Sequence, residues 1–360
     1  METEKKSKRS AIRAYLTKKG VTLSPKLYFV DSMSKMALGL FATLLLSTIF
    51  STVARYVPWD MLNTMADFAK AATGAVLGIS VAYALGAPPL VLFSAGAVGM
   101  CGNDLATAFM LGGAEKLITA GPLGAFICAL VATEVGKLVS GETKVDIIVT
   151  PVTTLATGVL LAKLICPAVA YCMYWLGYFI NYTTTILPLL MGIVISVLVG
   201  VILTLPISSA AICAMIGISG LAGGAATAGC CAQMVGFAVI SFRENRWGGV
   251  IAQGLGTSML QMGNIVKNPK IWIPPTLASA ITGPIATCIF KLECTGVSAG
   301  MGTCGMVGPI GIFTDMGFGA QSIVGVLLVC IVLPAALSLV FSEILRRIGW
   351  IKPDDMKLSL

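Results

Sequence analysis

The chain has 360 residues, of which 57% are hydrophobic and only 11% are charged, and its formal net charge is +8. Ordinary soluble domains carry about 25% charged residues. The composition therefore excludes a soluble globular protein and indicates one whose solvent is mostly lipid. The chain contains no histidine, which excludes a histidine-dependent triad, histidine metal ligands and a phosphohistidine on this polypeptide.

Positive charge gathers at the two ends of the chain. Residues 1–35 hold nine lysines and arginines against three acids. The positive-inside rule puts such a segment in the cytoplasm, and the basic residues near the other end put that end there too: Arg346, Arg347, Lys352 and Lys357. We expect an even number of crossings, with anionic lipid rather than nucleic acid facing the basic arm. The expected divisions are a basic arm over 1–35, a membrane permease domain over 36–346 and a cytoplasmic tail over 347–360.

Apolar runs predict the first membrane elements. Met36–Ala54 is expected to be the first membrane helix. Ala71–Leu85 follows, and its Gly74 and Gly78 have the small-xxx-small spacing of closely packed membrane helices. Glycine and proline at residues 86–89 then break this segment.

Further helices are expected along the rest of the chain. One continues to about Met110, and the next crossing is expected over Lys116–Val139. Leu164–Phe242 is a run of 79 residues without Asp, Glu, Lys or Arg. Since about 20 apolar residues cross a bilayer, this run has room for about three to four crossings. The sequence predicts an all-α polytopic membrane protein with about eight to ten crossings.

Two stretches are built almost entirely of small residues, Ser208–Cys230 and Thr295–Gly319. A pair of glycine-interrupted segments in a transporter is a pointer to re-entrant hairpins around a substrate site. The alternative is tight helix packing through small residues. The second stretch also fits G-x-G-x-x-G and G-x-S-x-G, but it lacks the soluble βαβ unit of a dinucleotide site and the histidine of a nucleophile elbow.

Ionisable groups at membrane depth are costly and usually functional. Asp104 lies beside Asn103, and together they offer a carboxylate and an amide. Glu134 precedes Lys137 by three residues on one helical face, so the two charges are expected to neutralise each other partly. A substrate role and an ion pair at the end of a helix both fit this pair. For Glu293, a substrate role and a position at the end of a helix both remain open.

Amides recur at helical spacing in Gln253, Gln261 and Asn264, and the last two share one face. Amides both donate and accept hydrogen bonds, which suits hydroxyl-rich ligands. Hydrogen bonds between helices are the alternative explanation.

Four segments carry a family resemblance, and they are spread over most of the chain. They are LYFVDSMSKMALGLFATLL (27–45), EVGKLVSGETKVDIIVTP (134–151), GTSMLQMGNIVKNPKIWIPPTLASAITGP (256–284) and SAGMGTCGMVGPIG (298–311). The chain resembles the membrane permease (enzyme IIC) component of bacterial sugar phosphotransferase systems. Within that family it is most similar to the stand-alone subgroup that includes perfringolysin O regulator-like proteins.

The resemblance implies a homodimeric permease of the bacterial cell membrane, with about ten helices per chain, two re-entrant hairpins and cytoplasmic termini. It implies transport of a sugar or similar small polar solute, with IIA and IIB partners on separate chains. A permease-fold regulator or sensor and an uncoupled secondary transporter are the alternatives. We expect no cofactor, no metal and no phosphoryl-carrying catalytic residue. The expected substrate contacts are Asn103, Asp104, Glu134, Gln261, Asn264, Glu293 and Thr303.

Overall fold

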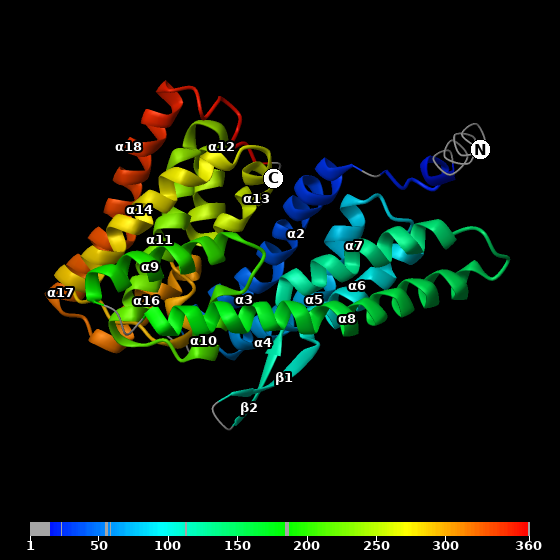
Figure 1. Ribbon diagram of the computed structural model, residues 1–360, viewed down its shortest axis with the longest axis horizontal. Helices are drawn as coiled ribbons and strands as arrows, with labels where there is room; N and C mark the ends of the chain where they lie inside the picture. The colour runs from blue at the N-terminus through cyan, green and yellow to red at the C-terminus, as the bar shows by residue number, and fades with distance from the viewer. Residues whose placement is uncertain are drawn as a thin grey trace. The chain divides into compact units, whose positions relative to one another are not determined.

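The computed structural model forms two compact units within one chain (Figure 1). The structure describes residues 15–22, 24–54, 57, 59–111, 114–183 and 187–358. The first unit comprises Met1–Gly39 and Ala72–Ala170, and the second comprises Leu40–Ala71 and Tyr171–Leu360.

The first unit is a helical bundle with one β-hairpin. Its elements are η1 (Leu27–Asp31), most of α2 (Ser32–Leu40), α5 (Thr73–Ala84), α6 (Pro89–Asp104), β1 (Ala106–Leu111), β2 (Ala114–Thr119), α7 (Gly121–Val139) and the first part of α8 (Asp146–Thr183). Buried apolar residues of α6, α7 and α8 form one cluster that includes Val98, Cys128 and Cys166. The uncharged faces of these helices therefore supply the core of this unit.

Helices α5 and α6 touch backbone to backbone. A Cβ at Gly74 would lie 2.8 Å from the Cα of Met100, and one at Gly78 would overlap the Ala95 carbonyl. The small-xxx-small packing predicted for Gly74 and Gly78 is confirmed.

A β-hairpin corrects the expected helix boundaries between α6 and α7. Helix α6 ends at Asp104, and β1 pairs antiparallel with β2 in the register Thr107↔Ile118 (Figure 1). The prediction of helix to about Met110, and again from Lys116, is therefore wrong. Leu105 already has an extended backbone, and β-branched residues such as Thr107 and Ile118 fit a strand better than a helix.

The second unit contains the remaining elements. They are η2 (Phe41–Leu45), α3 (Leu46–Ala54), α4 (Asp60–Ala71), the rest of α8, α9 (Pro188–Thr204), α10 (Ser209–Ile216), α11 (Gly220–Ile240), α12 (Phe242–Ile251), η3 (Ala252–Gly256), η4 (Ser258–Gln261), α13 (Met262–Lys267), η5 (Pro269–Trp272), α14 (Ile273–Pro284), η6 (Ile285–Ile289), α15 (Gly296–Ala299), η7 (Cys304–Met306), α16 (Val307–Met316), α17 (Ala320–Gly325), η8 (Val326–Val332) and α18 (Leu333–Arg347). Helix α11 lies among α9, α14 and α18. Its many glycines and alanines let these neighbours approach closely.

The two glycine-rich stretches meet in the second unit, where α10 packs against α15. The Ser209 hydroxyl donates to the Gly300 carbonyl at 2.7 Å. A Cβ at Gly223 would overlap the Cys294 carbonyl. These contacts show close packing through small residues at this place. That the stretches form re-entrant hairpins stays a prediction.

Among the described residues, five helices are long and apolar enough to cross a membrane, or up to six if the broken pair α4 and α5 forms one span. They are Leu27–Ser51, Gly121–Val139, Asp146–Ile180, Gly220–Ile240 and Ala320–Arg347. The prediction of a helical membrane protein is confirmed. The larger number of crossings stays a prediction.

Candidate functional site

Glu134 and Lys137 form a buried ion pair on α7. The Lys137 Nζ lies 3.3 Å from both carboxylate oxygens of Glu134. Only 1% of the Lys137 side chain and 13% of the Glu134 side chain is exposed. The pairing predicted from their spacing is confirmed, and it lies in a helix long and apolar enough to span a membrane.

Lys137 has a second partner, the carbonyl of Leu85, which its Nζ meets at 2.9 Å. Leu85 is the residue that caps α5, where Gly86 has a φ of +65° and Pro88 and Pro89 follow. The last carbonyls of a helix have no partner within that helix. The buried ammonium therefore ties α7 to the break between α5 and α6. Sequence reasoning missed this contact, because no local pattern joins residues 52 positions apart.

The Glu134 carboxylate keeps unused hydrogen-bonding capacity. Its Oε2 is buried and accepts no hydrogen bond within the described part of the chain, and the hydroxyl of neighbouring Thr133 is also buried and unpaired. Tyr28 is the other titratable neighbour of this carboxylate. A buried unpaired polar atom costs about 1–3 kcal/mol. The arrangement can lower that cost by accepting a hydrogen bond from a ligand hydroxyl.

Asn103 and Asp104 form a separate pair at the end of α6. The Asn103 amide donates to Asp104 Oδ1 at 2.6 Å. The adjoining Gly102 packs against Gly124, near the start of α7. Glu134 lies ten residues further along α7, which corresponds to about 15 Å of helix. The two predicted sites in this unit are therefore not in direct contact.

In the second unit, the predicted amides form a chain of hydrogen bonds. Asn264 donates to Gln261 at 2.8 Å, Gln261 donates to Gln253 at 2.9 Å, and Gln253 donates to the Ser241 hydroxyl at 2.8 Å. The expected proximity of Gln261 and Asn264 is confirmed. The three residues do not share one helix, however, because η3, η4 and α13 are successive short turns.

The same amides hold the C-terminal segment in place. Gln261 donates to the Met356 carbonyl and Asn264 to the Lys357 carbonyl, both at 2.9 Å. Asn245 donates to the Met356 carbonyl at 2.7 Å. The Met356 side chain is fully buried. Any ligand that bound these amide groups would have to displace this segment. The sequence did not predict the contact between these amides and the C-terminal backbone.

The last two candidates differ in exposure. Thr303 is buried, and its hydroxyl donates to the Gly254 carbonyl at 2.5 Å. Glu293 is exposed, and its backbone N–H donates to the Met316 sulfur at 3.2 Å. The Thr303 hydroxyl therefore donates its hydrogen bond within the protein, whereas Glu293 is exposed.

The chain matches the family described as "Phosphotransferase system, EIIC" over residues 30–358. The protein belongs to this family. Comparison with curated proteins and with solved structures finds no match. The family match confirms the resemblance to enzyme IIC permeases and covers nearly all of the described residues, whereas the subgroup within the family stays a prediction. An EIIC chain is the membrane component of a phosphotransferase system, so the protein is an integral membrane protein of transport.

Proposed function

We propose that this EIIC protein is a permease for a sugar or a similar small polar solute. It would act in the bacterial cell membrane as a homodimer with cytoplasmic termini, and IIA and IIB proteins on separate chains would phosphorylate the solute. The family match over residues 30–358 supports this function. The lack of histidine supports partners in trans, because a phosphohistidine would have to be carried by another chain.

The buried Oε2 of Glu134, which is ion-paired with Lys137 but accepts no hydrogen bond within the described residues, is the observation that supports a substrate site best. An ionised carboxylate only accepts hydrogen bonds, and sugar hydroxyls donate them. Lys137 offsets part of the charge, so a neutral solute could approach without meeting an isolated anion. The other proposed contacts are Asn103, Asp104, Gln261, Asn264, Glu293 and Thr303. Gln261 and Asn264 would reach the solute only if the C-terminal segment moves.

Uptake of a labelled sugar panel tests the function. Cells expressing the protein would be compared with and without the general phosphotransfer proteins. We expect uptake that disappears when those proteins are removed. Uptake that persists would instead mean an uncoupled secondary transporter. If no sugar enters although folded protein is present in the membrane, the permease proposal fails and the permease-fold regulator is favoured.

Glu134→Gln tests the site. Gln keeps the size of the side chain but removes the charge-assisted acceptor, a change of about 1.5–3 kcal/mol or roughly 10- to 150-fold in uptake. The matched control is Glu142→Gln, just beyond the end of α7 in an exposed position. Equal uptake by Glu134→Gln and the control, at equal membrane abundance, would refute the site.

A further inference from the structure

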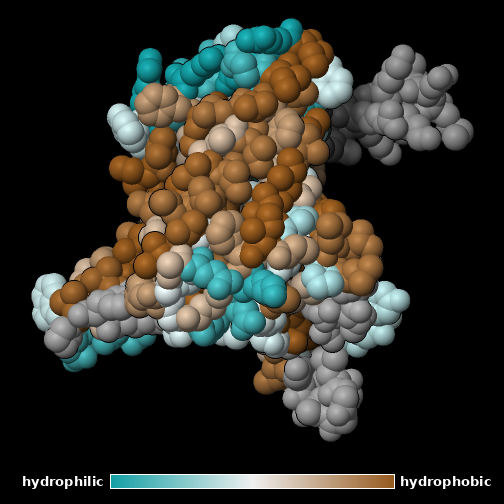
Figure 2. Space-filling view, turned by 90° about the vertical axis from the view of Figure 1, so that its left-hand side faces the viewer, coloured by the Kyte–Doolittle hydropathy of each residue, from teal (hydrophilic) through white to brown (hydrophobic). Residues whose placement is uncertain are grey.

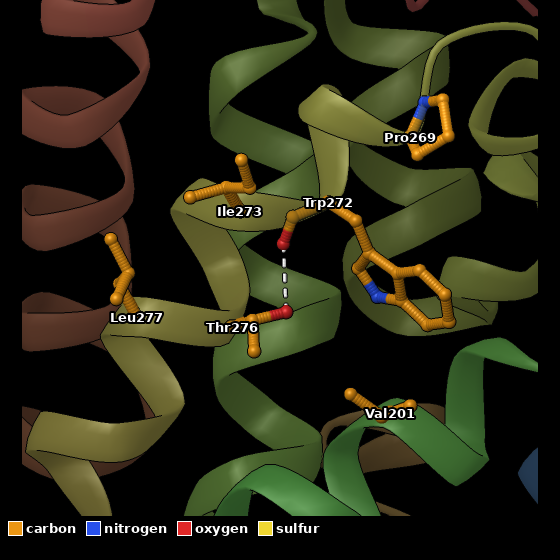
Figure 3. Close-up of a pocket in the computed structure, with 6 residues that line it drawn as sticks. All are labelled: Val201, Pro269, Trp272, Ile273, Thr276 and Leu277. Carbon is orange, nitrogen blue, oxygen red and sulfur yellow. Dashed lines mark hydrogen bonds between the residues drawn. The ribbon is translucent and has the colours of Figure 1, made fainter.

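An apolar groove opens between α9, η5 and α14 in the second unit (Figure 3). Its volume is about 330 Å³, and it is lined by Val201, Pro269, Trp272, Ile273, Thr276 and Leu277. This volume is near the lower end for small-molecule pockets. In Figure 3 the Trp272 indole points toward Val201.

The groove offers no polar group that is free to bind a sugar. The Trp272 Nε1 donates to Gln233 Oε1 at 3.0 Å. The Thr276 hydroxyl donates to the Trp272 carbonyl at 2.7 Å and accepts from Gln233 Nε2 at 3.2 Å. Both polar side chains of the lining are therefore already paired, and the occupant must be apolar along this wall.

Two lysines adjoin the groove lining in sequence, and one of them contacts an aromatic ring. Lys270 follows the lining residue Pro269 on the same turn, and Lys267 lies at the end of α13 just before it. Both lysines are exposed, and within the described residues neither forms an ion pair with a carboxylate. The Lys270 Nζ lies over the Trp350 ring, 4.8 Å from its centroid.

Lysine and tryptophan gather at the level of lipid headgroups. Figure 2 shows hydrophilic residues over the α12 and α18 end of the second unit, above a band of hydrophobic surface. The apolar face continues along α14 through the exposed side chains of Leu277 and Ile281. We therefore expect the Lys270 end of the groove to lie nearer the headgroups than the Ile281 end.

We propose that this groove binds one anionic phospholipid. An acyl chain would lie against Trp272, Ile273 and Leu277, and the phosphate would meet Lys267 and Lys270. The positive charges of the two lysines favour an anionic occupant, because each contributes about 1 kcal/mol of attraction to an anionic headgroup near the membrane surface. In a two-fold contact centred on this groove, the same lysines of two copies would repel each other. A second copy is therefore the poorer occupant.

Native mass spectrometry of the purified full-length protein tests the proposal. The probes are phosphatidylglycerol and phosphatidylcholine with identical acyl chains, titrated separately. We expect one phosphatidylglycerol to be retained preferentially. Lys267→Gln with Lys270→Gln should weaken its binding roughly 30-fold, since two charges at about 1 kcal/mol each are removed. The matched control is Lys352→Gln, another exposed lysine close in sequence to Trp350.

Leu277→Trp tests the groove itself. The larger side chain should fill the groove and abolish preferential retention, whereas Leu339→Trp on the exposed face of α18 should not. Equal retention of the two lipids, or unchanged retention in the double lysine variant, would overturn the proposal. Loss of a dimer in Leu277→Trp with lipid retention intact would assign the groove to a second copy instead. None of these results depends on transport, so the proposed permease function is tested separately.

Discussion

The ion pair on α7 and the amide chain of the second unit are both buried polar clusters, but they differ in how completely the protein satisfies them. The amide groups of Gln253, Gln261 and Asn264 form hydrogen bonds with one another, with the Ser241 hydroxyl or with backbone carbonyls. The buried Oε2 of Glu134 faces the Lys137 ammonium at 3.3 Å but accepts no hydrogen bond within the described residues. Most buried polar groups in proteins are paired, so an exception calls for an explanation.

The difference separates two roles that the sequence alone left open. A fully paired cluster holds elements together, and removing one member costs stability. An incompletely paired carboxylate can also take a ligand, so its removal should cost transport. Substitutions in the two clusters should therefore change different measurements.

Lys137→Met should give the largest loss of stability. Breaking a buried ion pair by removing one partner costs about 3–5 kcal/mol, because the remaining charge is uncompensated. The Leu85 carbonyl also loses its donor. The measurement is denaturant unfolding of the purified protein in detergent. Lys163→Met, at an exposed lysine of α8, is the matched control.

Two outcomes sharpen this test. Adding Glu134→Gln to Lys137→Met should restore part of the stability, since the stranded charge is then removed. If Lys137→Met unfolds at the same denaturant concentration as Lys163→Met, the ion pair does not tie α7 to the α5–α6 break.

Gln261→Ala should cost less, about 1–3 kcal/mol, because it leaves buried amide partners unpaired. Removing the donor to the Met356 carbonyl should loosen the C-terminal segment. Protease cleavage at Lys357 is the measurement, with uptake recorded per folded molecule. We expect faster cleavage, and uptake per folded molecule then shows whether Gln261 also contacts the solute once the C-terminal segment moves. Lost uptake with an unchanged cleavage rate would instead place Gln261 at the solute.

Glu142→Gln should have the smallest effect. Lys19 pairs with Glu142 at 2.5 Å, and its hydrogen bond, followed by its charge, lowers the pKa of this exposed carboxyl. Because the pKa of this carboxyl is lowered in the folded state, its contact with Lys19 stabilises the fold above the ordinary carboxyl pKa of 4.5. This stabilisation is lost as the pH falls through the pKa of the folded state. Lys19 also donates to the Ser140 carbonyl at 2.6 Å, which should hold the arm partly in place.

Hydrogen exchange of residues 15–22, corrected for intrinsic rates, measures this contact. In the unmodified protein, the protection of these amides from exchange should fall as the pH drops below the ordinary carboxyl pKa. In Glu142→Gln, this protection should be lower at pH 7 and should depend less on pH. Identical pH profiles for the two proteins would show that Glu142 does not anchor the arm.

Local spacing predicted several features of the fold and site correctly. Gly74 and Gly78 lie four residues apart and face α6, and Glu134 and Lys137 lie three apart and pair. Such spacings fix neighbours along one helix, because residues three and four apart share a face. Long uncharged runs likewise predicted membrane helices, because a bilayer requires them.

The sequence did not predict contacts between residues that lie far apart in the chain. The Leu85 carbonyl and Lys137 are 52 positions apart, and Gln261 and Met356 are 95 apart. The residues around Thr107 formed part of an expected helix, although they form a strand. Short apolar runs do not distinguish a buried strand from a helix segment by periodicity alone.

The packing of Gly223 against the Cys294 carbonyl and of Gly300 against Ser209 limits how the second glycine-rich stretch can move. Backbone atoms have no rotamers that could swing aside. Closely packed contacts switch between discrete arrangements rather than deforming continuously. We therefore expect any gate formed by residues 294–300 to have two discrete conformations, one packed on α11 and one detached from it, with no stable intermediate.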